Sequence, residues 1–170
     1  MKTDDVVDAP MDLRGRGAAF RNRVINPTMF RVYMLAKMPV LGVTGTYLTE
    51  IDTHRCVATL PCGWTTKNLF GNTFNAAVLA AAETASVALL VLHLRNQEAE
   101  VTPEVVKIES RFGKSRLEEL TLRCDDGERY AEFVARAAAA DGAIEETFTI
   151  RGLDQVGRPR HEVDLTWRLS

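Results

Sequence analysis

One segment constrains the fold most: residues 76–94 are almost all small or apolar, with Glu83 near their centre. Glu83 is the only formally charged side chain between Lys67 and Arg95. Burying a carboxylate costs several kcal/mol unless the group is paired, hydrogen-bonded or protonated. A lone acid in the best core segment of a chain is therefore a candidate functional group.

This segment is long enough to raise the question of a membrane span, which takes about 20 apolar residues. Four polar side chains interrupt it: Glu83, Thr84, Ser86 and His93. A charge near the centre of a spanning helix costs roughly 2.5–3.5 kcal/mol, and alanine dominates where larger apolar residues are typical. We therefore predict a buried helix of a soluble protein, which starts near Asn72 or Thr73 and ends near Leu94. Apolar side chains on every face indicate that it is enclosed.

The composition of the chain fits one soluble domain. It has 170 residues, of which 46% are hydrophobic and 26% charged, and this is ordinary for a globular protein. The net charge of −2 gives no electrostatic reason to expect nucleic acid as a partner. Cys56, Cys62 and Cys124 have neither zinc spacing nor an even count. We expect reduced thiols in a cytoplasmic protein without a metal site and without a membrane partner.

The N-terminal 25 residues differ from the rest of the chain. They mix charges of both signs: Asp4, Asp5, Asp8, Asp12, Arg14, Arg16, Arg21 and Arg23. No apolar stretch typical of a secretory signal is present in them. We expect residues 1–25 to form a loosely ordered arm, which can be helical in part, ahead of a single domain over residues 26–170.

The remaining elements follow from periodicity. Asn26, Pro27 and Thr28 signal the start of a helix that Pro39 ends, and the Ala-rich residues 130–140 favour another helix. Alternation of apolar and polar residues predicts strands at 43–51, 56–60, 106–112, 120–124, 147–151 and 162–169. In the strand over 106–112, the alternation predicts one buried face. Short turns between successive strands favour an antiparallel sheet, so we predict an α+β protein whose sheet wraps around one long central helix.

The segment that leads into this helix carries a resemblance. Asn68 is followed three residues later by Gly71, and Glu83 lies in the middle of the helix. This pattern resembles the signature of hot-dog thioesterases of the phenylacetate-degradation type, in which His-Gly-Gly opens the helix. Here Phe74 occupies the His position, and Asn75 and Ala76 replace the two glycines. The resemblance implies the hot-dog fold.

A second resemblance is to a less characterised thioesterase-like branch, the DUF4442 branch, which also lacks His-Gly-Gly. The similar segments are the helix over Pro27–Met38, Trp64, the entry Lys67–Gly71 and the closing strand Asp164–Arg168. Both resemblances imply hydrolysis of a thioester, with coenzyme A as part of the substrate and no separate cofactor.

The helix offers groups for this chemistry. The first amides, near Phe74 and Asn75, lack intrahelical partners and can polarise a carbonyl. Glu83 can act as general base for water or as nucleophile. Phe74 and Glu83 are nine residues apart, roughly 13 Å along the axis, so they cannot act on one carbonyl within a subunit. We therefore expect a homodimer with two interfacial sites, and pairing of dimers into tetramers stays open.

Further candidates have simpler explanations beside the functional ones. Asn68 can bond the catalytic loop or the substrate, or form a turn. Asn72, with Asn75, can replace the missing His, although capping explains Asn72 equally well. Gly71 belongs to the predicted substrate site with them. Thr84 can orient water or bond back to the helix carbonyl four residues earlier.

The substrate predictions extend to both ends of an acyl-CoA. Leu79, Ala80, Ser86 and Val87 are expected to line an apolar acyl pocket. Arg111, Lys114 and Arg116 can meet the phosphates of coenzyme A, or form a solvated basic strand end. We expect Trp64 to pack the first hairpin against the helix.

Two functions from different classes remain. The leading one is an acyl-CoA thioesterase, with acyl carrier protein as an alternative donor. The rival is a non-catalytic hot-dog protein that binds acyl-CoA or a fatty acid. A dehydratase is disfavoured because its chemistry uses a His base, and no His lies near the start of the helix.

Overall fold

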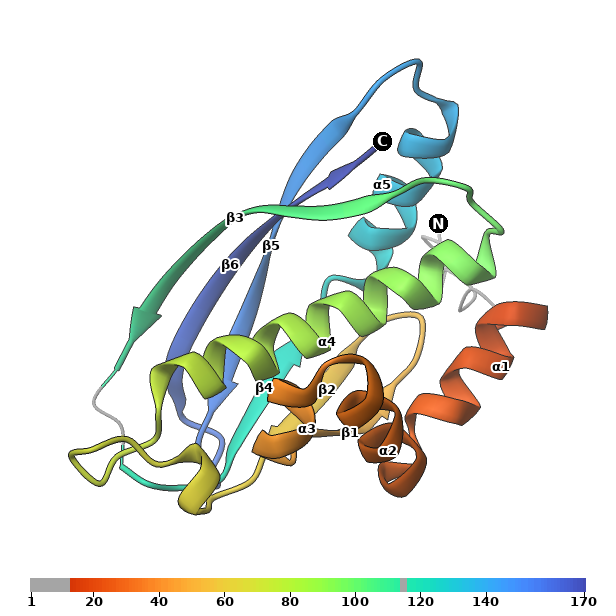
Figure 1. Ribbon diagram of the computed structural model, residues 1–170. Coiled ribbons are helices and arrows are strands. Elements are labelled where there is room, and N and C mark those ends of the chain that lie inside the picture. Colours follow the sequence, from red (N-terminus) through yellow and green to blue (C-terminus); the bar gives the residue numbers. More distant parts are fainter. Residues whose placement is uncertain (1–12, 114–115) are drawn as a thin grey trace, which may run out of the picture.

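A computed structural model describes residues 13–113 and 116–170 of the chain (Figure 1). The helices are α1 (Gly15–Val24), α2 (Pro27–Lys37), α3 (Pro39–Thr44), α4 (Asn75–Asn96) and α5 (Gly127–Ala139), with a 3₁₀ turn η1 (Trp64–Thr66). The strands are β1 (Tyr47–Ile51), β2 (Cys56–Leu60), β3 (Pro103–Phe112), β4 (Leu120–Cys124), β5 (Ile144–Leu153) and β6 (Pro159–Leu169).

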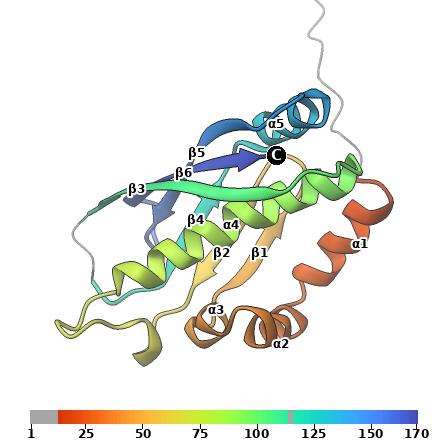
Figure 2. The same cartoon turned by 45° about the horizontal axis from the view of Figure 1, so that its top comes forward.

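The six strands form one antiparallel sheet in the order β1-β2-β4-β5-β6-β3. The sheet curves around α4, and α1 to α3 lie beside α4 along its β1 side (Figures 1 and 2). The predicted α+β class, with an antiparallel sheet around one long helix, is confirmed.

Small side chains explain how α4 lies so close to the sheet. Five alanines are buried along it, namely Ala77, Ala81, Ala82, Ala85 and Ala88. The helix is long and apolar enough to cross a membrane, but 72% of its apolar stretch is buried inside the molecule. It is therefore the core helix that the sequence predicts.

A buried hydrogen-bond network connects α4 to α5 and β6. The indole N–H of Trp167 donates to Ser86 Oγ at 2.8 Å, and Ser86 Oγ lies 2.6 Å from the Tyr130 hydroxyl. All three side chains are buried. Tyr130 also stacks on Phe148, with 3.7 Å between the ring centroids. Ser86 thus joins α4 to α5 and β6.

The described part of the expected N-terminal arm is helical, as the sequence allowed. Residues 1–12 of the expected arm lie outside the described residues, but α1 lies within it and is an ordered helix that packs on α4. Val24 is buried there, and Gly17 lies so close to Asn96 that a Cβ at Gly17 would be 2.8 Å from the Asn96 side-chain oxygen. Pro39 does end α2, but it also opens α3 at the first helical position, which proline favours.

The strand predictions hold for β2, β4, β5 and β6, and two others need correction. Val43 lies in α3, so the first strand begins only at Tyr47. β3 is an edge strand, and it does not bury the alternate residues as predicted: Ile108 is 45% exposed and Ser110 is exposed. A shift in register between Val105 and Lys107 breaks the alternation.

Candidate active site

The loop before α4 is held by Asn68. Its side-chain oxygen accepts from the backbone N–H of Phe70 at 2.9 Å and of Asn72 at 3.0 Å. Its own N–H donates to the Asn72 carbonyl at 2.8 Å. Gly71 closes the turn with φ +78°, a conformation that residues with a side chain rarely adopt. These contacts give Asn68 and Gly71 a loop-forming role, and their part in catalysis or substrate binding stays a prediction.

Helix α4 begins two or three residues later than expected. Asn72 and Thr73 remain in the loop, because Asn72 is bonded to Asn68 and Thr73 pairs with Lys67. Phe74 is the N-cap, and its side chain makes no capping hydrogen bond. A capping role for Asn72 is therefore wrong.

The donors at the helix start are shifted by one residue from the prediction. The Phe74 N–H is occupied, because it donates to the Thr66 carbonyl at 2.8 Å. The N–H groups of Asn75 and Ala76 are the first two of the helix, and no hydrogen bond of either is found within the described residues. They lie at the positive end of the helix dipole. The pair that can polarise a carbonyl is thus Asn75 and Ala76.

Glu83 lies two turns further along α4 and is partly buried. Loss of hydration raises the pKa of its carboxyl above the ordinary value of 4.5. No salt bridge of Glu83 is found among the described residues. Because Glu83 is only partly buried, water can reach this acid, and its partial burial increases the proton affinity of the carboxylate.

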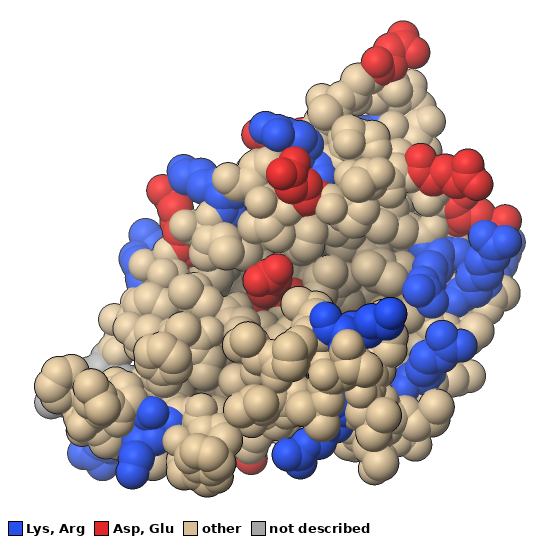
Figure 3. All heavy atoms as spheres, in the orientation of Figure 1, with Lys and Arg blue, Asp and Glu red and all other residues tan. Residues whose placement is uncertain are grey.

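The face of α4 around Glu83 is apolar and incompletely covered. Leu79, Ala80, Val87 and Val91 share this face and are each partly buried, whereas the opposite faces of the helix are closed. Figure 3 shows that the middle of this side of the molecule is largely uncharged, with one acidic and one basic side chain close together near its centre and further charged side chains towards the edge. The open face is the side on which a substrate could reach Glu83.

Two neighbours of Glu83 are settled by their contacts. The Thr84 hydroxyl donates to the Ala80 carbonyl at 2.7 Å, which is the back-bond to the helix, so this proton is not used to orient water. Ser86 was expected on the acyl side, but it faces the sheet and is bonded to Trp167. Ser86 therefore does not line an acyl pocket near Glu83.

The three basic residues predicted to contact the phosphates of coenzyme A differ in their surroundings. Arg111 is 78% exposed and forms an ion pair with Glu162, and this hydrogen bond raises the pKa of the Arg111 guanidinium. Lys114 lies outside the described residues. Arg116 is exposed, and its carbonyl accepts from the Thr73 hydroxyl at 2.7 Å. Arg116 thus lies beside the start of α4, whereas Arg111 is held by a carboxylate.

The loop that leads into α4 exposes large apolar side chains. Trp64, Leu69 and Phe70 are 85%, 101% and 87% exposed. The expectation that Trp64 packs the hairpin against the helix is therefore wrong. A hollow of about 740 Å³ is lined by residues of this loop and by Phe74 and Asn75, so it lies at the free helix amides.

Sequence reasoning missed a second group of residues. Side chains of α1, α2 and α3 close a cavity of about 210 Å³ against α4, together with Thr84 and Val87. Nothing local in the sequence marks them, because α1 and α2 reach α4 only through tertiary packing. Of the predicted substrate residues, this cavity includes Thr84 and Val87, and Leu79 lies outside it.

The fold is similar to those of several solved structures. A candidate thioesterase from Shewanella oneidensis has a TM-score of 0.70 at 9% identity, over 89% of this chain and 97% of that protein. A candidate thioesterase from Pseudomonas aeruginosa, of unknown function, has a TM-score of 0.68 at 18% identity, over 84% and 95%. A Haemophilus influenzae thioesterase has a TM-score of 0.61 at 15% identity, over 82% and 87%. The chain has the hot-dog fold.

At these sequence identities the structural similarity establishes the hot-dog fold but not the reaction, which has to be argued from the residues of the site. No protein-family model matches the chain, and no curated protein matches it. The resemblance to the DUF4442 branch therefore stays a prediction. The core helix of this hot-dog fold carries both the free amides and the acid.

Proposed function

We propose that this protein is a thioesterase that hydrolyses an acyl-CoA. The proposal rests on two features of α4. The backbone N–H groups of Asn75 and Ala76 have no hydrogen-bond partner within the described residues, and the Glu83 carboxylate is partly buried. Neither feature alone is chemically sufficient. Together they supply an electrophile stabiliser and a base, which are the two groups that thioester hydrolysis needs.

The reaction balances with these groups and water. The Glu83 carboxylate takes a proton from a water molecule, and the water oxygen forms a bond to the thioester carbonyl carbon. The carbonyl electrons move onto its oxygen, which the N–H groups of Asn75 and Ala76 stabilise. When the tetrahedral intermediate collapses, the C–S bond breaks, and the thiolate takes the proton from Glu83. The products are a carboxylic acid and coenzyme A.

Glu83 can alternatively attack the carbonyl itself and form an anhydride, which water then cleaves. A single turnover in H₂¹⁸O separates these routes. General-base catalysis puts ¹⁸O only into the product acid. Nucleophilic attack leaves ¹⁸O in the protein when water opens the anhydride at the Glu83 carbon, so label found in Glu83 establishes that route.

Two copies of the chain are needed for one site. Asn75 and Glu83 are eight residues apart on one straight helix, about 12 Å along the axis, which exceeds the reach of a single carbonyl. The site forms if the helix start of one subunit faces Glu83 of its partner. The exposed apolar loop at Leu69 and Phe70 and the unpaired edge of β3 support an interface between copies.

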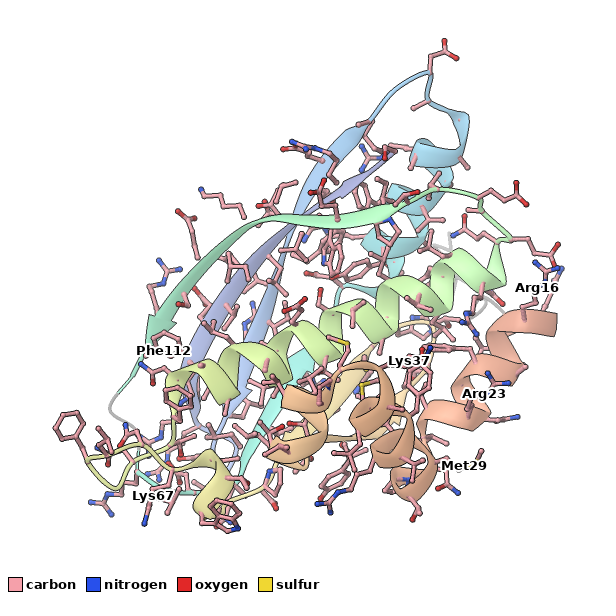
Figure 4. All side chains as sticks on the ribbon, viewed as in Figure 1. Arg16, Arg23, Met29, Lys37, Lys67 and Phe112 are labelled. Atoms are coloured by element: carbon pink, nitrogen blue, oxygen red, sulfur yellow. The ribbon has the colours of Figure 1, made fainter. Side chains whose placement is uncertain are left out.

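The coenzyme A moiety would lie at the start of α4. Figure 4 shows Lys67 and Phe112 at the end of the molecule where α4 begins, and Arg116 is tied to Thr73 there. Lys67 and Arg116 are exposed cations at this end and suit phosphate groups. Arg111 is a weaker candidate, because binding a phosphate would have to break its pair with Glu162. We also propose that the protein is cytoplasmic and that acyl carrier protein is an alternative to coenzyme A as the acyl donor.

The experiment is thiol release from acyl-CoAs of increasing chain length by wild type and Glu83→Gln. Glutamine keeps the size of the side chain but is neither base nor nucleophile. Turnover by wild type that falls at least about a hundredfold in the variant supports the proposal, in line with general-base contributions of 10²–10⁴. Equally slow release by both proteins, or none by either, would favour the rival, an acyl-CoA-binding protein without turnover.

A further inference from the structure

A partly open apolar cavity of about 210 Å³ lies between the N-terminal helices and α4. Phe20 on α1 and Phe30 and Met34 on α2 form its outer wall, and Thr84 and Val87 on α4 form part of its inner wall. It is separate from the hollow at the helix start, which is lined by residues 67–75.

Thr84 is the first residue of α4 in the lining of the cavity, and Glu83 itself is not part of that lining. Thr84 follows Glu83 directly, and Val87 lies one turn further along the same face of the helix. From there the cavity continues to Arg95, which is twelve residues beyond Glu83 and so about 18 Å along the axis. The cavity therefore runs away from the acid, towards the C-terminal end of α4.

The lining defines the class of ligand. The Thr84 hydroxyl donates a hydrogen bond to the Ala80 carbonyl, so it does not need a polar group of the ligand as a partner. The charged lining residue, Arg95, has its guanidinium 4.7 Å from the centroid of the Phe20 ring, which partly satisfies it. Between these two ends the wall is aromatic, aliphatic and thioether. An unbranched hydrocarbon chain matches such a space.

The volume sets the length of that chain. An apolar cavity of about 150 Å³ is known to bind benzene, which has six carbons. By this comparison, a cavity of about 210 Å³ accommodates roughly eight carbons. We infer that the cavity binds the tail of a medium-chain, unbranched acyl group of about eight carbons, with the carbonyl at Glu83 and the methyl end towards Arg95.

This inference rests on the proposed function for the identity of the head group, but not for binding of the tail. It also assigns the tail to one subunit: the chain that supplies Glu83 holds the acyl group, and its partner supplies the helix amides. Flexible methionine in the wall allows some adjustment of length.

The test uses S-alkyl-CoA thioethers with 4, 8 and 12 carbons, which bind but cannot be hydrolysed, and 1-octanol as a probe without coenzyme A. Val91→Phe fills the cavity from α4, because Val91 lies in its lining. Val32→Phe is the matched control, because Val32 is exposed on α2 and outside the lining. Binding is measured by calorimetry, and folding of each variant by thermal melting.

We expect wild type to bind the 8-carbon thioether more tightly than the 4-carbon one. Val91→Phe should weaken the 8-carbon thioether and 1-octanol by roughly tenfold or more, with little change for the 4-carbon thioether. Val32→Phe should bind all probes as wild type does. Met34→Ala, which enlarges the cavity, should shift the preference towards 12 carbons.

The outcomes separate the two proposals. If wild type hydrolyses acyl-CoAs but Val91→Phe changes neither thioether binding nor the chain-length profile, the cavity assignment is overturned and the proposed function stands. If no acyl-CoA is hydrolysed, yet Val91→Phe abolishes binding of the 8-carbon probes, the cavity assignment stands and hydrolysis is rejected. If wild type binds neither 1-octanol nor any thioether, the cavity assignment is overturned.

Discussion

The backbone N–H of Phe74 donates to the carbonyl of Thr66 over 2.8 Å. This bond joins the N-cap of α4 to η1. A contact across the loop therefore fixes the direction in which the backbone N–H groups of Asn75 and Ala76 point. Because Phe74 is engaged, Asn75 is the first residue whose N–H is free to face a substrate. The placement of the donors at the start of α4 therefore depends on a hydrogen bond between backbone groups.

Asn75→Pro should remove that donor and leave the helix intact. Proline is favoured at the first helical position, and Phe74, with φ −75° and ψ 120°, already has the backbone that precedes proline. We expect hydrolysis to fall by about 10²–10³ with little change in melting temperature. Asn75→Ala keeps the N–H and should retain most activity; a loss as large as that of Asn75→Pro would mean that the side chain acts instead.

Glu83→Gln should stabilise the protein at neutral pH. The folded-state pKa of Glu83 is raised by burial, so between 4.5 and that higher pKa the folded state binds more protons than the unfolded state. Stability therefore falls as pH rises through this window, and the cost is full above it. Thermal melting should show a rise of a few degrees at pH 8, since about 1 kcal/mol corresponds to roughly 2–4 °C at this size.

The same comparison at pH 4 should show a much smaller difference, because Glu83 is then protonated in the folded state and mostly protonated in the unfolded state. Glu132→Gln on the exposed face of α5 is the control, with no expected gain at pH 8. A variant Glu83→Gln that is less stable than wild type at pH 8 would show that the carboxylate is held by favourable contacts and not merely desolvated.

Ser86→Ala should destabilise the fold. Its removal leaves the Trp167 indole N–H and the Tyr130 hydroxyl buried without their common partner. The expected loss is about 1–3 kcal/mol in the free energy of unfolding, measured by urea denaturation. Ser110→Ala on the exposed edge strand should change the free energy of unfolding by less than about 0.5 kcal/mol. Equal effects of the two substitutions would contradict a stabilising role of the network.

His93 should make the protein sensitive to mild acid. It is fully buried, and its Nε2 lies 3.1 Å from the Thr53 carbonyl. Burial lowers the pKa of His93 from 6.5 to about 4. Between these values the unfolded state binds more protons, so stability is lost as pH falls from 6.5 towards 4. The loss is on the order of 3 kcal/mol at most, at about 1.4 kcal/mol per pKa unit.

His93→Gln can still donate to Thr53 but does not titrate, so the stability of this variant should vary less between pH 6.5 and pH 4 than that of wild type. A wild-type slope that survives in His93→Gln would assign the acid sensitivity to other groups, of which His161, with a pKa also lowered by burial, is the first to test.

Most of the fold was predictable because its signals are local. Alternation along β6 and the Ala-rich run of α4 are visible in the sequence itself. β3 was misjudged because alternation does not reveal that a strand lies at the edge of a sheet. α3 was missed because Pro39 both ends one helix and begins the next.

The site was predictable only in part, for a related reason. Glu83 stands out as a charge in an apolar run, whereas the bond from Phe74 to Thr66 spans a loop and leaves no mark in the sequence. Ser86 was misplaced because α4 is apolar on every face, so its sequence does not tell which flank meets the sheet. The cavity under α1 and α2 depends on how separate helices pack.

Subunit complementation between Asn75→Pro and Glu83→Gln tests most directly whether each site uses the acid of one subunit and the helix amides of its partner. Each variant alone should be nearly inactive. Co-folded in equal amounts, they should recover about a quarter of wild-type thiol release, because half of the dimers are mixed and each mixed dimer of a symmetric pair has one intact site. Activity of the mixture no greater than the mean of the two parents would contradict the account.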